Sequence, residues 1–409
     1  MVSPLDLSYM KLVRFTFSLI DCWPHRDMKS KNPIPLTNNK FLFCVILFVF
    51  VAELIYIKNN VGVLSFLILG HTYITVLITF NSLFRLTLPW NKKYRQLIID
   101  FVENIHVFHY KDESEYSKKM HNKIHKASLY FIVFLHVQMY FGIILFNITP
   151  LLNNIKAGLL EEKLSPNVTI DIELSIYYDL PFDSQENLKA YSMVFLLNFF
   201  VSFVNTFVMC INELFISLIA IHLWGHFKIL ENNLINFPLP KLTDQNISYD
   251  EEESIAVKNL LIKYMKQHQV ATDFLSKTVN VFGPTMCLYY LFQQISECIV
   301  LCELCKLDAE ALGKYGILTL VIFQQLIQIS IVYEIMASMN EKIIKAVYNL
   351  PWEYMSVGNQ KIVLFFLQNV QIPFNLRALD IVPIGAQTMV TIIRTSFSYF
   401  IMLRTIAYD

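Results

Sequence analysis

Charged residues are scarce in this 409-residue chain: only 16% are Asp, Glu, Lys or Arg, whereas soluble domains carry about 25%. The 33 basic and 33 acidic residues balance, which removes the usual electrostatic argument for a nucleic-acid partner. No Rossmann, P-loop, HExxH or GxSxG motif occurs, so no enzymatic signature competes for the interpretation. The composition indicates lipid as the solvent and predicts neither an enzyme nor a cofactor.

The chain has seven cysteines, which is an odd number, and their spacing is not that of a disulfide framework. Cys302 and Cys305 form a CxxC pair, but no second pair or histidine lies near them to complete the four ligands of a zinc site. Packing or a local disulfide is therefore favoured, and no metal is predicted. The N-terminal forty residues are polar and lack the apolar core of a cleaved signal peptide, so the first hydrophobic helix is expected to remain in the product.

Long apolar runs are abundant, and hydrophobic residues make up 55% of the chain. A membrane-spanning helix needs roughly 20 mostly apolar residues. Seven segments qualify: 41–57, 63–88, 128–152, 190–222, 281–301, 315–338 and 381–403. The predicted fold class is an all-α membrane protein with seven transmembrane helices. The fourth run is too long for one crossing, and amphipathic sequence over about 219–280 predicts helical extensions that pack together outside the membrane.

Basic residues are unevenly distributed between the two sets of connections. The N-terminal segment and the connections on its side carry 24 Lys and Arg, whereas the opposite connections and the C-terminal tail carry 7. Because cytoplasmic loops carry the excess, the N-terminus is predicted to be cytoplasmic and the C-terminus extracellular. G-protein-coupled receptors have the reverse orientation, which excludes that class. The sequon at Asn167 lies on the predicted outer side and is a candidate glycosylation site.

These features divide the chain into four predicted parts. Residues 1–40 form a cytoplasmic segment, and 41–340 form the first six helices with their cytoplasmic extensions. Residues 341–379 form a cytoplasmic anchor helix region, because Pro373 and polar residues up to Asp380 interrupt the apolar sequence. Residues 380–409 form the last span and a short extracellular tail.

The last span carries a stripe of polar residues. At 100° per residue, six side chains fall within an arc of about 80°. They are Gln387, Thr391, Arg394, Ser398, Met402 and Thr405. The apolar residues expected on the opposite side are Val390, Ile393, Phe397 and Phe400.

A charge at mid-bilayer is costly, so such a stripe faces either its own bundle or a water-filled path. The second interpretation is preferred, and it requires several subunits around a closed symmetry axis, because one helix cannot enclose a pore. Met402 is the large apolar member near the outer end and is the candidate constriction, with packing as the alternative.

Aromatic and uncharged polar residues are mixed in the external halves of spans two to six, a lining that suits a small organic molecule of low charge. The candidates are His71, Tyr73, Thr75, Gln138, Phe141, Phe146, Tyr191, Asn198, Phe199, Tyr290, Gln293, Gln294, Phe323, Gln324 and Gln328. For each residue alone, packing or interhelical hydrogen bonding is the commoner explanation. Glu213, Glu297 and Glu334 are expected near the membrane boundaries, where ordinary solvation accounts for them.

Five segments carry a family resemblance. They read HLWGHFKILENNL, YMKQHQVATDFLSKTVNVF, AVYNLPWEYM, FFLQNVQIPFNL and IIRTSFSYFIMLR. Together they resemble successive signatures of insect odorant receptors, from about residue 35 to the end and most specifically over the last hundred residues.

The resemblance implies an odorant-gated, non-selective cation channel that needs no G protein, in the plasma membrane of olfactory sensory neurons. Members form tetramers with a shared coreceptor, held by the intracellular anchor around a pore made by the last helix. The small hydrophobic odorant binds within each subunit, among spans two to six. The family motif places the gate at Met402 and the vestibule at Ser398 and Arg394. The chain lacks the coreceptor's long intracellular insertion, so it resembles an odorant-tuning subunit.

Three other classes of protein share some of these features. A gustatory receptor would share the fold, although the C-terminal motif favours olfaction. A transporter would use the intramembrane polar groups as a substrate path, but its halves are expected to show inverted repeats, and none is visible. A membrane enzyme would need His, Cys or acidic residues clustered at one depth.

Overall fold

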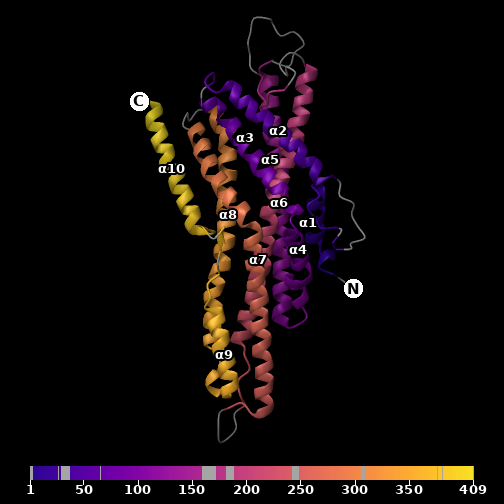
Figure 1. Cartoon of the computed structure of the whole chain (residues 1–409), viewed down its shortest axis with the longest axis vertical. Helices are drawn as coiled ribbons and strands as arrows, with labels where there is room; N and C mark the ends of the chain where they lie inside the picture. The colour runs from indigo at the N-terminus through magenta and orange to yellow at the C-terminus, as the bar shows by residue number, and fades with distance from the viewer. Residues whose placement is uncertain are drawn as a thin grey trace.

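Long helices packed lengthwise make up the computed structural model of the protein, an elongated bundle with α9 at its lower end and the C-terminus of α10 at its upper end (Figure 1). The described residues are 3–25, 27–28, 37–64, 66–158, 172–180, 188–241, 248–304, 309–374, 376–379 and 381–408.

The α-helices are α1 (Ser8–Leu19), α2 (Asn39–Asn60), α3 (Phe66–Leu86), α4 (Lys92–Asp100), α5 (Glu115–Lys156), α6 (Leu188–Ile235), α7 (Glu251–Leu304), α8 (Ala309–Tyr348), α9 (Val357–Val370) and α10 (Ala386–Tyr408). Short helical turns are η1 (Pro4–Asp6), η2 (Leu88–Trp90), η3 (Phe101–Ile105), η4 (Val107–Tyr110) and η5 (Trp352–Tyr354). A two-stranded antiparallel hairpin, β1 (Arg377–Ala378) and β2 (Val382–Pro383), precedes α10.

Each of the seven predicted spans falls largely within one helix, from α2, α3, α5, α6, α7, α8 and α10 in chain order. Among the described residues, five helices are long and apolar enough to cross a membrane: α2, α5, α6, α7 and α8. The protein is therefore a helical membrane protein, and the seven-span layout and the orientation of its termini remain predictions.

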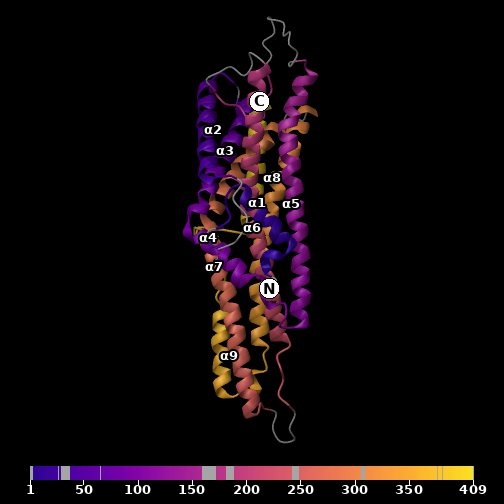
Figure 2. The same cartoon turned by 90° about the vertical axis from the view of Figure 1, so that its right-hand side faces the viewer.

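The two longest described helices are far longer than a bilayer requires. α6 has 48 residues and α7 has 54. At 1.5 Å per residue they extend about 72 and 81 Å, against about 30 Å of hydrocarbon. Beside the lower part of α7 lies α9, as both views of the bundle show (Figures 1 and 2). The amphipathic extensions expected from the sequence therefore pack on one another at the end of the bundle that holds α9.

The start of the last helix differs from the prediction. The apolar run begins at Ile381, but residues 382–383 form β2 and α10 begins at Ala386. Pro383 cannot donate a backbone hydrogen bond, and Gly385 adopts a φ of 152°, which residues with a side chain rarely adopt. A Cβ at Gly385 would also lie 3.3 Å from Glu334 Oε2. The helix is therefore forced to begin after this turn.

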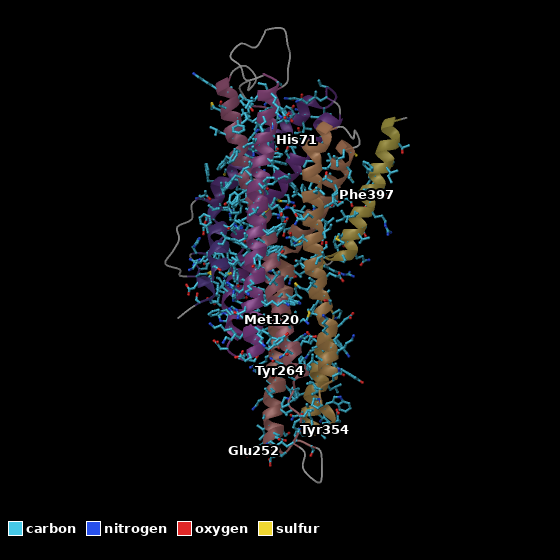
Figure 3. All side chains as sticks on the ribbon, turned by 180° about the vertical axis from the view of Figure 1, so that it is seen from behind. His71, Met120, Glu252, Tyr264, Tyr354 and Phe397 are labelled. Carbon is cyan, nitrogen blue, oxygen red and sulfur yellow. The ribbon has the colours of Figure 1, made fainter. Side chains whose placement is uncertain are left out.

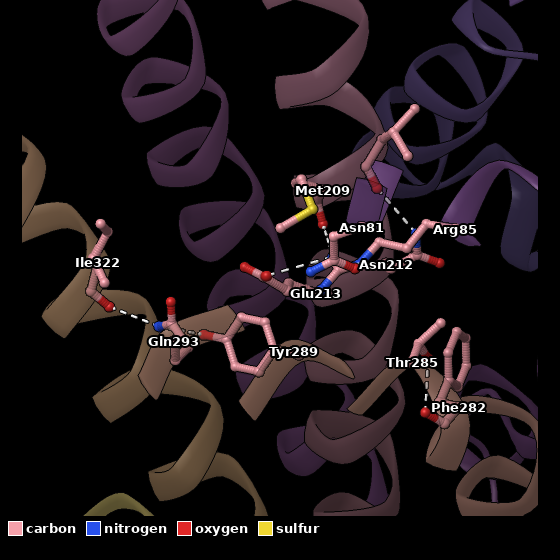
Figure 4. A network of polar contacts seen from close by, with 11 residues as sticks. Asn81, Arg85, Met209, Asn212, Glu213, Phe282, Thr285, Tyr289, Gln293 and Ile322 are labelled. Atoms are coloured by element: carbon pink, nitrogen blue, oxygen red, sulfur yellow. Dashed lines mark hydrogen bonds and ion pairs between the residues drawn. The ribbon is translucent and has the colours of Figure 1, made fainter. Parts of the chain in front are cut away.

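A charged pair lies inside the bundle between α3 and α6 (Figure 4). Arg85 and Glu213 are 1% and 3% exposed, and Arg85 Nη1 lies 3.5 Å from Glu213 Oε1. The same Nη1 donates to the Met209 carbonyl at 2.5 Å, and Nε donates to Asn81 Oδ1 at 3.3 Å. The guanidinium also lies 5.7 Å from the centre of the Tyr289 ring. The expectation that Glu213 is solvated at a boundary is wrong, because Arg85 compensates its charge in the interior.

A hub of aromatic and imidazole rings joins α1 to α6. Tyr9 Oη lies 2.5 Å from His106 Nε2 and 3.0 Å from His222 Nε2. The Nδ1 atoms of both rings accept backbone N–H groups, from Phe108 and Val107 respectively. In the neutral rings the proton therefore lies on Nε2, and both rings donate to the Tyr9 oxygen. Protonation of either Nδ1 would place two N–H groups face to face, so this packing requires neutral histidines.

Acidification should destabilise this part of the molecule. Burial lowers the pKa of His106 to about 2, and those of His226 and His268 to about 4, from 6.5. Because the unfolded chain binds these protons more readily, folding loses stability as pH falls below 6.5. Between pH 7 and 5.5 we expect a loss of about 1 kcal/mol for each histidine.

Thermal unfolding of the purified protein across this pH range measures the effect. The variant His268→Gln should remove the share of this histidine, about 1 kcal/mol between pH 7 and 5.5, because glutamine does not titrate. Stability that is constant or rises on acidification would contradict the expected neutral packing.

Candidate functional site

The best-connected set of predicted ligand residues lies at the upper end of the bundle, where a short segment, the strap (residues 172–180), packs on α3, α5 and α6. His71 Nε2 lies 2.7 Å from the Ser175 carbonyl oxygen, and its ring stacks on Phe146 at 5.7 Å between centres. Asn198 donates to the Ile176 carbonyl at 3.2 Å and accepts from the Tyr178 hydroxyl. His71, with Phe146 stacked on it, and Asn198 are therefore both anchored to the strap.

The strap is also held at its edges. Asn154 on α5 donates to the Glu173 carbonyl at 2.8 Å, accepts the Glu173 N–H at 3.0 Å, and donates to the Tyr191 hydroxyl at 3.2 Å. The Tyr177 ring stacks on Tyr56 of α2 at 5.6 Å. Tyr191 therefore supports the strap, and its ring neighbours Phe195, which in turn neighbours Phe199.

A second set is a ladder of glutamines between α5 and α8. Gln138 donates to Gln324 Oε1 at 2.5 Å, and Gln324 donates to Gln328 Oε1 at 2.8 Å. On α7, Gln293 is fully buried and donates to the Tyr289 hydroxyl at 3.1 Å and to the Ile322 carbonyl at 2.9 Å (Figure 4). Gln138 therefore links α5 to α8 through Gln324, and Gln293 links α7 to α8 through the Ile322 carbonyl.

The remaining candidates are dispersed. Phe141 is 58% exposed on the outside of α5. Tyr73 packs against a small separate core around Ile299 and Ile322, and the Thr75 hydroxyl donates to the Thr72 carbonyl at 3.0 Å. Tyr290 is buried on α7, whereas Gln294 and Phe323 face α10. The fifteen candidates thus form several separate sets of contacts rather than one, because sequence spacing does not fix how each helix is rotated about its axis.

Glu53 on α2 was not singled out from the sequence. It is fully buried, and neither carboxylate oxygen has a hydrogen-bond partner among the described residues. The hydroxyls of Thr75 and Thr79 lie beside it but donate to backbone carbonyls of their own helix. Asn205 on α6 donates to Thr79 Oγ1 at 3.4 Å. The signal was present, since Glu53 is an acidic residue within the first apolar run.

The polar stripe of α10 faces away from the subunit. Its members Gln387, Thr391, Arg394, Ser398, Met402 and Thr405 are all exposed, and Met402 is 51% exposed. Thr391 and Ser398 donate only to backbone carbonyls of α10 itself. No described part of the chain therefore covers this face, and among the described residues no contact supports the alternative of a stripe satisfied within one subunit.

The face of α10 that packs on the bundle differs from the expected apolar one. Ile392 and Ser396 are buried, at 5% and 0% exposure, whereas Val390 and Phe397 are 47% and 45% exposed. Gln294 on α7 donates to Ser396 Oγ at 3.0 Å, and Ser396 donates to Glu297 Oε2 at 3.2 Å. Glu297 is 1% exposed, so the expectation that it is solvated is also wrong.

Two sites proposed from the sequence lie outside the described residues: the sequon at Asn167 and the second cysteine of the CxxC pair, Cys305. No group of three or more potential metal ligands occurs in the part of the chain that the structure describes.

Comparison with known proteins identifies the family. A family model described as 7tm odorant receptor matches residues 65–397. A Drosophila melanogaster protein named as odorant receptor 92a is 23% identical over 199 residues, and this alignment covers 49% of the chain and 46% of that relative. The chain thus matches about half the length of this curated relative.

Solved structures share the whole fold. The insect olfactory receptor OR5 from Machilis hrabei matches with a TM-score of 0.73 and 12% identity, over 97% of this chain and 98% of that one. The same receptor in complex with eugenol matches with a TM-score of 0.75 at the same identity and coverage. Since the family model covers most of the sequence, this chain belongs to the 7tm odorant receptor family.

Proposed function

We propose that the protein is the odorant-tuning subunit of a ligand-gated, non-selective cation channel, assembled as a tetramer with a shared coreceptor. The observation that carries this proposal is the row of polar side chains on α10 that its own subunit leaves exposed. Exposure of a row containing Arg394 to lipid is costly. If the α10 helices of several subunits surrounded a closed symmetry axis, the row would instead line a water-filled path. Met402 then forms the apolar constriction, with Ser398 and Arg394 in the vestibule below it.

The membrane arrangement that fits this function has the N-terminus in the cytoplasm, seven spans and the C-terminus outside, in the plasma membrane of olfactory sensory neurons. Residues 1–40 and 341–379 are then cytoplasmic, and the latter region, with the extensions over about 219–280, anchors the subunits to one another. The excess of basic residues on that side supports this orientation.

The odorant site that we propose lies beneath the strap, among α3, α5 and α6. His71, with Phe146 stacked on it, and Asn198 are anchored to the strap there, and they offer an aromatic surface with a few polar groups, as pockets for small organic molecules do. Eugenol, in complex with OR5, is a molecule of this kind. The other candidate residues are assigned to helix packing in this proposal.

Substitution in the strap region should change odorant sensitivity without changing conduction. Replacing Phe146 with alanine removes the ring that stacks on His71 and should raise the half-maximal odorant concentration at least tenfold. The exposed Phe141, five residues earlier on the same helix, provides the matched control, and Phe141→Ala should stay within about twofold of wild type. Equal effects of the two variants would place the odorant elsewhere.

The channel function is tested by co-expression with the coreceptor in cells under voltage clamp. An odorant panel should evoke cation current within milliseconds, with no requirement for GTP. Current that depends on GTP, or an N-terminal tag that is accessible from outside, would contradict the proposal.

A further inference from the structure

Burial of the described side chains of α10 is confined to the inner half of the helix. Ile392 and Ser396 are buried, whereas no described side chain beyond Ser396 on this helix is buried. The views of the whole chain show the outer part of α10 running apart from α8, with Phe397 near the point of separation (Figures 1 and 3). The exposed outer part includes Met402, the candidate gate.

The outermost hydrogen bonds that join α10 to another helix, among the described residues, form a closed polar contact between α7 and α10. Gln294 Nε2 donates to Ser396 Oγ at 3.0 Å, and Thr395 Oγ1 returns a hydrogen bond to Gln294 Oε1 at 2.9 Å. Ser396 also donates to Glu297 Oε2 at 3.2 Å. Gln294, Glu297, Thr395 and Ser396 are called the latch below.

The latch is buried, so its hydrogen bonds hold α10 against α7 more strongly than the same bonds would in water. Ser396 and Glu297 are 0% and 1% exposed, and the second carboxylate oxygen of Glu297 has no partner among the described residues. Ser396 is therefore the one described side chain that bonds this carboxylate. Tilting α10 away from α7 would break these bonds and leave buried polar groups unsatisfied, which is unfavourable in a low-dielectric interior.

A second attachment fixes the inner end of the helix independently. The N–H of Ala386, at the first turn of α10, donates to Glu334 Oε2 on α8 at 3.4 Å. The inner end of α10 is held at α8 and its middle is held by the latch. The outer half is held less, because its described contact with the bundle is the one between the rings of Phe397 and Phe323 and none of its described side chains is buried. The latch therefore lies where a change in the angle of that half would begin.

We propose that the latch holds the outer half of α10 in the non-conducting position, so that opening requires it to break. Gln294, Glu297, Thr395 and Ser396 are thus positioning residues for the gate, and this assignment rests on the proposed channel function. Weakening the latch favours the open state before any odorant binds. With a weaker latch, less odorant binding free energy is needed to open the channel.

The experiment compares Ser396→Ala with Ser338→Ala in cells that express the coreceptor. Ser338 is exposed on α8 and donates only to the Ile335 carbonyl of its own helix, so it is the matched control. Ser396→Ala removes two buried hydrogen bonds and should raise the odorant-free current about tenfold and lower the half-maximal odorant concentration severalfold. Ser338→Ala should match wild type.

Glu297 supplies the test of specificity. Glu297→Gln retains an oxygen that accepts from Ser396 and should stay within about twofold of wild type, whereas Glu297→Leu should reproduce the Ser396→Ala result. If Glu297→Leu and Ser396→Ala merely destabilised the protein, both variants would instead give less current than wild type. Reduced or unchanged odorant-free current in Ser396→Ala, at normal surface expression, would overturn the latch.

Hydrogen–deuterium exchange on the purified protein separates this inference from the channel proposal. Ser396→Ala should accelerate amide exchange over 396–408 and leave 386–391 unchanged, whether or not the protein conducts. Unchanged exchange would overturn the latch. If exchange is faster but no form of the protein conducts, wild type included, the latch is supported and the channel function is contradicted.

Discussion

Replacing Arg85 with methionine should leave little folded protein at the cell surface. The substitution leaves the Glu213 carboxylate 3% exposed and without its cationic partner in the interior. Removal of one member of a buried ion pair costs about 3–5 kcal/mol, which is a large share of the 5–15 kcal/mol that typically separates folded from unfolded protein. The measurement is the yield and unfolding temperature of the detergent-solubilised protein.

Two further variants make the interpretation specific. The double variant Arg85→Met with Glu213→Met removes both charges and should recover most of the loss, because apolar side chains of similar size avoid the desolvation cost. Arg95→Met breaks an ion pair with Asp27 whose side chains are 38% and 45% exposed, and it should cost less than about 1 kcal/mol. If the double variant were as unstable as Arg85→Met, the deficit would come from lost packing rather than from an unpaired charge.

Replacing Met402 with aspartate should open a leak. If Met402 closes the pore by excluding water, a charged ring at that depth would be hydrated and would attract cations. We expect odorant-free current at least tenfold above wild type, with altered permeation among monovalent cations. The recording is made in cells that express the variant with the coreceptor.

The conservative variant Met402→Leu retains an apolar side chain of similar volume and should keep the odorant-free current near the wild-type level. Normal surface expression of Met402→Asp with wild-type current would show that this side chain packs laterally and does not constrict a pore.

Apolar run length predicted the positions of the helices well, because the need to satisfy backbone hydrogen bonds in lipid makes every long apolar run helical. The boundary of α10 was misplaced, since its run begins at Ile381 and the hydropathy of a segment does not register the turn at Pro383 and Gly385. Pro383 and Gly385 both disfavour a helix and are visible in the sequence, so they indicate a start of α10 after Gly385.

Helix periodicity also indicated the exposed stripe of α10, but it could not reveal what the opposite face contacts. Thr395 and Ser396 lie outside the stripe and bond to α7, about a hundred positions away in the chain. Likewise, the sequence indicated Glu213 as an unusual residue but not its partner Arg85, 128 positions away. Pairing across such distances depends on how helices rotate and slide against each other, which no local pattern determines.

The candidate ligand residues illustrate the same limit. Those near the strap are gathered by a segment of the connection between α5 and α6, whose packing no periodicity anticipates. Phe141 and Phe146 are five residues apart on α5, yet one is exposed outside the bundle and the other stacks on His71. The rotation of α5 about its axis decides which of these two aromatic residues faces the bundle and is available to a ligand.

Cysteine accessibility along α10 tests the shared conduit most directly. Single cysteines at Thr391, Ser398 and Phe397 are introduced into channels whose own cysteines do not respond to a charged thiol reagent, which is applied from outside during odorant exposure. Modification at Thr391 and Ser398 should block the current, whereas modification at Phe397, which lies outside the stripe and whose ring contacts Phe323 on α8, should leave it unchanged. Block at Phe397 alone, or at none of the three positions, would contradict a pore lined by the polar stripe.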